Sequence, residues 1–290
     1  MKSASAPLTK QATSGGLDVP ESMIYSVYMV MLVDTMAGCI STPVMPYYAE
    51  SFGVPDSYIG FLYSAFSFTA TVFAPMLSGM ADTWGRKSVL VACLVGAGTA
   101  NVIQGLAVYC GSFGFWVFVF GRAFSGVWAS VGATCNVYVT DVTAEGPLRE
   151  KYLGQLAMVP TLAIMTGPGI GGGLAKAFGN NVPVTVDGVM TLISALIVHC
   201  HLVETPAFLK SKAKKLAAAS NEPGNQKKQD APSTPPSLHI LGIASLVSTL
   251  ASQGNLAMYA LFFKHAYKFD TLLVGFLFMG SAVMMLLTMM

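Results

Sequence analysis

The sequence predicts an all-α protein that crosses a membrane several times, and three observations lead to this fold class. Hydrophobic residues make up 53% of the 290 residues and charged residues only 10%, whereas soluble domains contain about 25% charged residues. The mean hydropathy of +0.60 is too high for a chain of this length to hide its apolar surface in one water-facing core. Apolar runs long enough to cross a hydrocarbon layer of about 30 Å recur along the whole sequence.

Apolar runs bounded by charged or turn-forming residues predict eight membrane-spanning helices. In chain order these predicted helices cover residues 23–48, 57–79, 88–110, 114–139, 152–178, 183–203, 239–263 and 271–290. The first six would form one bundle over residues 23–203, after a polar cytoplasmic tail at 1–22. Residues 204–238 contain six lysines among Pro, Ser and Asn, and we interpret them as a flexible cytoplasmic linker. The last two helices, within 239–290, would open a second bundle.

The basic residues predict the orientation of the chain. If the N-terminus is cytoplasmic, twelve of the sixteen Lys and Arg residues lie in cytoplasmic segments and three in outer segments, with Arg122 inside a predicted helix. Because cytoplasmic loops of membrane proteins are enriched in Lys and Arg, this asymmetry places the N-terminus and the linker in the cytoplasm. We therefore expect a multi-pass integral membrane protein surrounded by lipid.

Asp34 is the only charged residue between Glu21 and Glu50, and it lies inside the first predicted helix. A carboxylate at the middle of a bilayer costs about 2.5–3.5 kcal/mol on insertion scales. Acids inside membrane helices usually face a polar cavity and mark a path for ions, protons or substrates. We therefore interpret Asp34 as a site that binds a proton or a cationic substrate.

The segment between the second and third predicted helices reads SGMADTWGRK over residues 78–87. Glycine permits a tight turn here, the acid can favour the positive start of the third helix, and the two bases can reach the cytoplasmic interface. This segment resembles the loop of the major facilitator superfamily, which has the form G-x-L-A-D-R-x-G-R-K. The resemblance implies a cytoplasmic gating loop, with matches at Asp82, Gly85, Arg86 and Lys87 and departures at Ser78, Met80 and Thr83.

Arg122 lies inside the fourth predicted helix, where an arginine is costly unless it faces a partner or a watery cavity. Small residues follow it at helical spacing, so this face can approach a neighbouring helix closely. The segment from Arg122 to Gly126 is similar to the family's R-x-x-x-G motif, which implies that Arg122 assists proton coupling by setting the charge state of Asp34. The alternative is a structural arginine that bonds backbone carbonyl groups.

The fifth predicted helix contains the pattern G-x8-A-x3-G-P-x2-G-G, which begins at Gly154 and ends at Gly172. Pro168 removes a helical hydrogen bond, and Gly167 and Gly171 allow bending and close helix contact. The pattern resembles the G-x8-G-x3-G-P-x2-G-G signature of the superfamily's drug:proton antiporters, which include multidrug and tetracycline resistance proteins. The resemblance implies that this helix forms a contact along which two bundles rock. Generic packing of small residues is the alternative.

Other polar residues within the predicted helices are candidates for contacts with a substrate, although hydrogen bonds between helices explain each of them equally well. These candidates are Asn101, Gln104, Asn136, Tyr138, Gln253 and Asn255. The five cysteines lie in or beside apolar runs without C-x-x-C spacing, so we expect no metal site. No motif indicates a cofactor or an enzymatic reaction, and the net charge of +2 gives no reason to expect nucleic acid binding.

The resemblance covers residues from about 25 to 290 and implies proton-coupled antiport, or efflux, of a small organic solute. Two alternatives remain open: a solute importer of the same superfamily, and a non-transporting membrane scaffold or incomplete gene product. In the superfamily, substrates bind between two six-helix bundles that rock against each other. Since the second bundle is represented by two helices, we expect the chain to need a partner chain, or the rest of a longer transporter, to complete a transport cycle.

Overall fold

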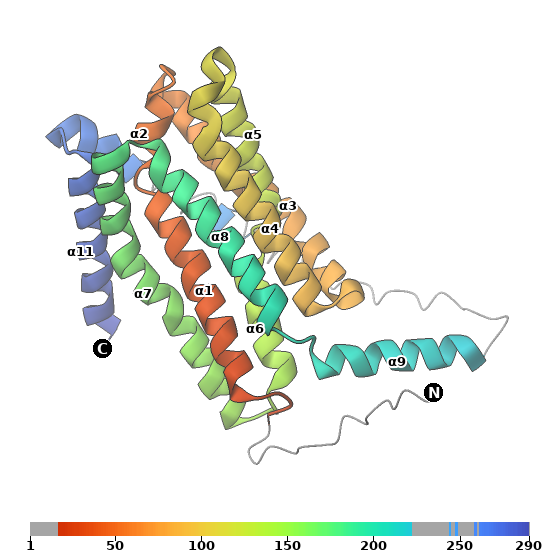
Figure 1. The fold of residues 1–290 in the computed structure, drawn as a ribbon. Coiled ribbons are helices and arrows are strands. Elements are labelled where there is room, and N and C mark those ends of the chain that lie inside the picture. The colour runs from red at the N-terminus through yellow and green to blue at the C-terminus, as the bar shows by residue number, and fades with distance from the viewer. Residues whose placement is uncertain (1–16, 222–243, 245–246, 249–257, 260, 290) are drawn as a thin grey trace.

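The computed structural model describes residues 17–221, 244, 247–248, 258–259 and 261–289. Over these residues the chain folds into helices, and the only β-bridge that they form joins Leu17 to Thr143 (Figure 1). The predicted all-α class is therefore confirmed. In chain order the helices are α1 (Glu21–Ser41), α2 (Met45–Glu50), α3 (Asp56–Trp84), α4 (Arg86–Leu106), η1 (Ala107–Phe113), α5 (Gly114–Val127), α6 (Val131–Val142), α7 (Pro147–Phe178), α8 (Asn181–His201), α9 (Pro206–Asn221) and α11 (Thr271–Met289).

Five helical runs in the described part of the chain are long and apolar enough to cross a membrane. They cover Glu21–Ser41, Tyr58–Trp84, Arg86–Val142, Pro147–Phe178 and Asn181–His201. The third run contains two of the predicted spans, because the short helix η1 joins α4 to α5 and these two helices pack against each other. The first six predicted spans therefore all correspond to apolar helices. Most of the seventh, 239–263, lies outside the described residues, and the eighth corresponds to α11.

The helices pack as a bundle in which α1 and α8 are central (Figure 1). Helix α1 packs against α7 and α8, while α4 packs against α8 and α5, and α3 packs against α5. Helix α11 lies along the outer side of α7. Helix α9 runs across one end of the bundle instead of along it (Figure 1). The central position of α1 and α8 decides which side chains can meet in the interior.

Two predicted spans are interrupted in the structure. The span predicted at 23–48 is divided into α1 and α2, because Pro43 in the intervening turn has no N–H to continue the helical hydrogen bonds. The span predicted at 114–139 is divided into α5 and α6 by an irregular turn at Trp128. The Trp128 indole occupies the space where a side chain on Gly96 of α4 would lie. The break therefore coincides with the insertion of a large ring between two helices.

The segment 206–221, which the sequence predicts as part of a flexible linker, forms helix α9. Its residues are mostly Ala, Lys and Leu, which have high helix propensity and favour this conformation locally. At its start the Phe208 side chain is buried against the end of the bundle, with one ring carbon near Gly85. The remainder of the predicted linker, 222–238, lies outside the described residues.

Glycines set the closest contacts between helices. A Cβ atom on Gly98 of α4 would lie 3.0 Å from the Gly188 carbonyl oxygen of α8, and one on Gly188 would collide with the α4 backbone. On α7, Gly167 and Gly171 face Cys39 and Ile40 of α1 in the same way. Close backbone approach of this kind is the usual role of small residues in membrane helices.

The next glycine of the α7 pattern faces a different helix. A Cβ atom on Gly172 would meet the backbone of Thr271 and Leu272 at the start of α11, and Gly275 of α11 faces the carbonyl group of Pro168. Gly154, at the start of the pattern, has open space around it. The glycine pattern of α7 thus contacts α1 on one side of the helix and α11 on the other.

We expect Gly171→Ala to destabilise the fold by about 1–3 kcal/mol, because the new methyl group would overlap the Ile40 carbonyl group. Gly173→Ala is the matched control, since this position lies two residues further along the same helix and has open space around it. Both changes alter helix propensity equally. Thermal unfolding of the purified chain in one detergent measures the difference, and equal melting temperatures for the two variants would contradict the contact.

Candidate functional site

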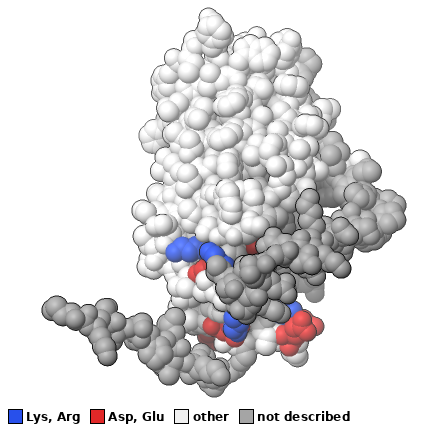
Figure 2. Space-filling model, turned by 90° about the vertical axis from the view of Figure 1, so that its right-hand side faces the viewer, with Lys and Arg blue, Asp and Glu red and all other residues white. Residues whose placement is uncertain are grey.

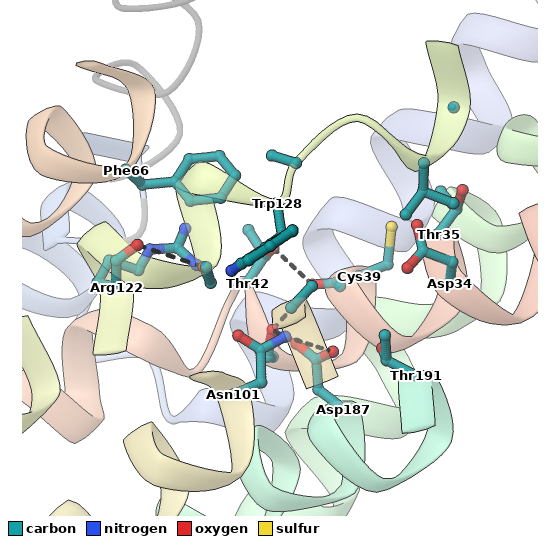
Figure 3. A pocket seen from close by; sticks show the side chains of 17 residues that line it. Asp34, Thr35, Cys39, Thr42, Phe66, Asn101, Arg122, Trp128, Asp187 and Thr191 are labelled. Carbon is teal, nitrogen blue, oxygen red and sulfur yellow. Dashed lines mark hydrogen bonds between the residues drawn. The ribbon is translucent and has the colours of Figure 1, made fainter. Parts of the chain in front are cut away.

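A polar cavity of about 360 Å³ lies in the interior of the bundle (Figure 3). It is lined from α1, α3, α4, α5, α6 and α8 and from the turn that joins α5 to α6. Its charged residues are Asp34 of α1, Asp187 of α8 and Arg122 of α5. The hydroxyl and amide groups of Ser41, Asn101 and other lining residues add further polarity. A cavity lined by these groups can accept a small polar or charged molecule, whereas lipid chains cannot form hydrogen bonds or ion pairs with them.

Asp34 lies in the cavity wall, as the sequence predicted for a functional acid. Its side chain is half-buried, and within the described residues its carboxylate has neither a hydrogen bond nor a salt bridge. Asp34 is the fourteenth residue of α1, so it lies about 20 Å along the axis from the start of that helix. It shares the cavity with Asp187.

Asp187 is a second acid in the cavity, and the sequence-based reasoning did not identify it. The residue is 3% exposed. Its Oδ2 atom accepts a hydrogen bond from Ser41 Oγ at 2.6 Å, and its Oδ1 atom accepts one from Asn101 Nδ2 at 3.0 Å. The signal that could have revealed it is the one that revealed Asp34, namely a lone acid inside an apolar run, here 183–203.

Two of the predicted cavity residues belong to the same hydrogen-bond network. Gln104 is fully buried and donates from Nε2 to Asn101 Oδ1 at 2.8 Å, so that Gln104, Asn101 and Asp187 form a chain from α4 to α8. The close α4–α8 contact at Gly98 and Gly188 brings these side chains within reach. Asn101 lines the cavity itself, whereas Gln104 supports it from behind.

Arg122 also lies in the cavity, held between aromatic rings. Its guanidinium carbon is 4.4 Å from the centre of the Phe66 ring and 5.6 Å from that of Tyr63, distances typical of cation–π contacts. Arg122 Nε is buried without a hydrogen-bond partner in the described structure. Arg122 shares the cavity with both acids, and Figure 3 shows Asp34 on the far side of the Trp128 ring.

The remaining predicted substrate contacts lie elsewhere. Asn136 is exposed and donates to the Gly132 carbonyl oxygen of its own helix, at 2.8 Å. Tyr138 is buried and donates to the Val203 carbonyl oxygen at 2.8 Å, which ties α6 to the end of α8. Neither residue lines the cavity. Gln253 and Asn255 lie outside the described residues.

The predicted gating loop forms a charged cluster at the end of the bundle that carries α9. Arg86 forms salt bridges with Asp82 and with Asp141 of α6, each at 2.8 Å. Lys87 Nζ donates to the His199 carbonyl oxygen of α8 at 2.9 Å. The loop therefore connects α3 and α4 to α6 and α8.

Glu204, just after α8, caps the start of α4. Its carboxylate accepts hydrogen bonds from the backbone N–H groups of Arg86 at 2.8 Å and Lys87 at 3.2 Å. The sequence suggested Asp82 for the role of favouring the positive end of this helix, but Asp82 lies in the last turn of α3 and pairs with Arg86. Gly85 has φ of 104°, and a side chain there would overlap the Glu204 carboxylate.

Comparison with known proteins gives consistent results. Residues 27–290 match the family model of the Major Facilitator Superfamily. The chain is 27% identical over 180 residues to the class B tetracycline resistance protein of Escherichia coli, which covers 61% of this chain and 43% of that protein. It is 25% identical over 259 residues to the class H tetracycline resistance protein of Pasteurella multocida, covering 87% of this chain and 61% of that protein. It is also 28% identical over 155 residues to multidrug resistance protein 2 of Bacillus subtilis, covering 53% of this chain and 37% of that protein.

Solved structures share the fold. The human organic anion transporter gives a TM-score of 0.64 at 20% identity, over 92% of this chain and 70% of the other. A D-xylose–proton symporter also gives a TM-score of 0.64, at 13% identity, over 90% of this chain and 66% of the other. The chain spans less than two thirds of the length of the curated relatives named above. The family match over residues 27–290, together with the shared fold, establishes that this chain belongs to the Major Facilitator Superfamily.

Proposed function

We propose that the chain takes part in secondary active transport, in which a small organic solute leaves the cytoplasm in exchange for protons. The observation that carries the proposal is the cavity with two acids and one arginine inside an apolar bundle. The relatives named for tetracycline and multidrug resistance support an outward direction and an organic solute. The antiporter-like glycine pattern of α7 supports the same branch of the superfamily.

Asp34 is the coupling residue in this proposal. Its carboxylate faces the cavity and has no partner among the described residues, so a proton and a cationic group of the solute compete for the same negative charge. A solute that enters from the cytoplasm would displace the proton, and a proton from the opposite side would later displace the solute. Such mutually exclusive binding at one site is sufficient to link the two movements.

Contacts at the end of the bundle opposite α9 support movement between two units. Lys264 forms a salt bridge with Glu50, and Lys176 pairs with Asp270 at 3.7 Å. Tyr47 donates a hydrogen bond to the Phe269 carbonyl oxygen at 3.0 Å. These contacts join the first bundle to the region of α11, and their opening would expose the cavity on that side. The glycine contact between α7 and α11 would be the surface along which the units rock, with a second bundle facing the cavity.

The distribution of charge supports an orientation in which the end with α9 is cytoplasmic. Figure 2 shows Lys, Arg, Asp and Glu gathered at the lower end of the molecule, while the rest of that face is uncharged. The loop bases Arg86 and Lys87 lie at this end with α9 and its lysines. The uncharged part of the surface would be in contact with lipid.

We expect Asp34→Asn to abolish proton-driven transport and to leave membrane insertion intact, because the change removes a charge from the apolar interior. Inside-out vesicles from cells that express the chain, with an imposed pH gradient and radiolabelled tetracycline or a lipophilic organic cation, measure uptake against the solute gradient. Glu145→Gln is the control, since it neutralises an exposed acid outside the cavity. Undiminished uphill uptake by Asp34→Asn would exclude Asp34 as the coupling site.

The native cysteines test the orientation without new residues. Cys110 in η1 and Cys200 at the end of α8 are both exposed, but they lie at opposite ends of the bundle, because Cys200 is next to His199, which bonds the Lys87 end of α4. We expect an impermeant maleimide applied to intact cells to label Cys110 and to spare Cys200 until the membrane is opened. Variants with each cysteine changed to Ser identify the labelled position. Labelling of Cys200 in sealed cells would reverse the proposed orientation.

A further inference from the structure

The two acids of the cavity have different surroundings. Each carboxylate oxygen of Asp187 accepts a hydrogen bond, one from Ser41 on α1 and the other from Asn101 on α4. Asp187 is therefore fixed from two neighbouring helices. The carboxylate of Asp34 has no such bonds within the described residues, although it lines the same cavity. One acid is held in place, and the other is free to bind.

Arg122 distinguishes between the two acids. Arg122 and both acids line the same cavity, but Figure 3 shows the Trp128 ring between Arg122 and Asp34. The described residues form no direct salt bridge to Arg122, whose guanidinium packs on Phe66 and Tyr63. A buried guanidinium without a nearby negative charge is strongly unfavourable, and the fixed carboxylate of Asp187 can supply that negative charge.

We propose that Asp187 is the permanent counter-charge of Arg122, and that this leaves Asp34 as the one exchangeable acid of the cavity. With both acids ionised and Arg122 positive, the cavity carries one net negative charge. It can then bind one proton or one monovalent cationic group of a solute, but not both. This inference rests on the proposed function, and it makes Asp187 a positioning residue in that exchange.

Packing around Asp187 supports a permanent role. The α4–α8 contact at Gly98 and Gly188 fixes Asn101 beside Asp187. On the other side, Gly167 and Gly171 of α7 contact Cys39 and Ile40 of α1, directly before Ser41. The hydrogen bonds to Asp187 are thus supported by close backbone contacts between helices, so its position does not depend on a bound solute.

The side chains around Asp187 determine which groups can bind or release a proton next to it. Helix α1 contributes Asp34 and Cys39, α5 contributes Arg122, and α4 contributes the neutral amides of Asn101 and Gln104. Helix α7 contributes no residue to the cavity lining. A measured change in proton binding within the cavity can therefore be assigned with a small set of variants.

A double-mutant cycle on stability tests the pairing. We expect Asp187→Asn to lower the melting temperature of the purified chain by several degrees, because Arg122 loses its counter-charge. The added change Arg122→Gln should restore much of this loss, since no buried charge is then left alone. The matched cycle with Asp34→Asn and Arg122→Gln should be additive. Equal or stronger coupling between Asp34 and Arg122 would overturn the proposal.

Proton binding gives a readout that a merely structural role would not change. The measurement is the proton uptake of the purified chain after a step from mildly alkaline to mildly acidic pH, and the contribution of Asp34 is the uptake lost in Asp34→Asn. We expect Asp34 to contribute one proton in the native background. In the Asp187→Asn background its contribution should fall to zero, because Arg122 then takes Asp34 as its counter-charge. In Asp187→Asn/Arg122→Gln the contribution of Asp34 should return to one proton. An unchanged Asp34 contribution in all three backgrounds would contradict the proposal.

If Asp187→Asn does not fold, Asp34→Asn in the native background decides the question: it should remove the one exchangeable proton, whereas pairing of Arg122 with Asp34 would leave that proton on Asp187. Arg122→Gln should bind one proton more than the native chain over the same pH step, because one acid no longer has a positive partner, and no extra proton would contradict the role of Arg122 in keeping an acid ionised. Neither measurement uses a solute. A chain that passes both tests but moves no solute even when a second bundle completes it would therefore contradict the proposed transport and not the assignment of Asp187.

Discussion

The structure depends on one constraint, which is that three charged side chains must be kept inside a bundle whose outer surface is apolar. Each charge would be costly in contact with hydrocarbon, so the helices that carry them must turn these residues toward one another. Helices α1, α5 and α8 do so around the cavity, and α4 adds amide groups between them. The central positions of α1 and α8 in the bundle follow from this requirement.

The glycines of α4, α7 and α8 are the means by which the constraint is met. Hydrogen bonds between side chains on different helices require backbones that approach closely, and glycine permits this approach. Gly98 and Gly188 bring Asn101 to Asp187, and Gly171 holds α1 where Ser41 can donate. The glycine contacts that pack the helices together therefore also position the polar side chains of the cavity.

Much of the fold could be predicted from the sequence, because apolar length and charge placement are local properties of a membrane protein. The first six spans, the position of Asp34 in the wall of a polar cavity and the family resemblance follow from such patterns. That Arg122 and Asp187 line one cavity could not be predicted, since it depends on the rotation of α5 against α8, and no local pattern encodes that rotation. The break at Trp128 likewise depends on Gly96 of another helix. The helix α9 was missed because a lysine-rich polar segment resembles a linker until its propensity is considered.

The cap that Glu204 forms on α4 has a consequence for how sequences of this kind can diverge. The carboxylate of Glu204 fills the space that any side chain at Gly85 would need, and it satisfies backbone groups that would otherwise lie bare at the start of α4. Gly85 also has a φ of 104°, which L side chains rarely adopt, so a substitution there is strained even if the residue at position 204 becomes smaller. We therefore expect sequences that keep the Glu204 cap to keep glycine at position 85, although the two positions lie far apart in the chain.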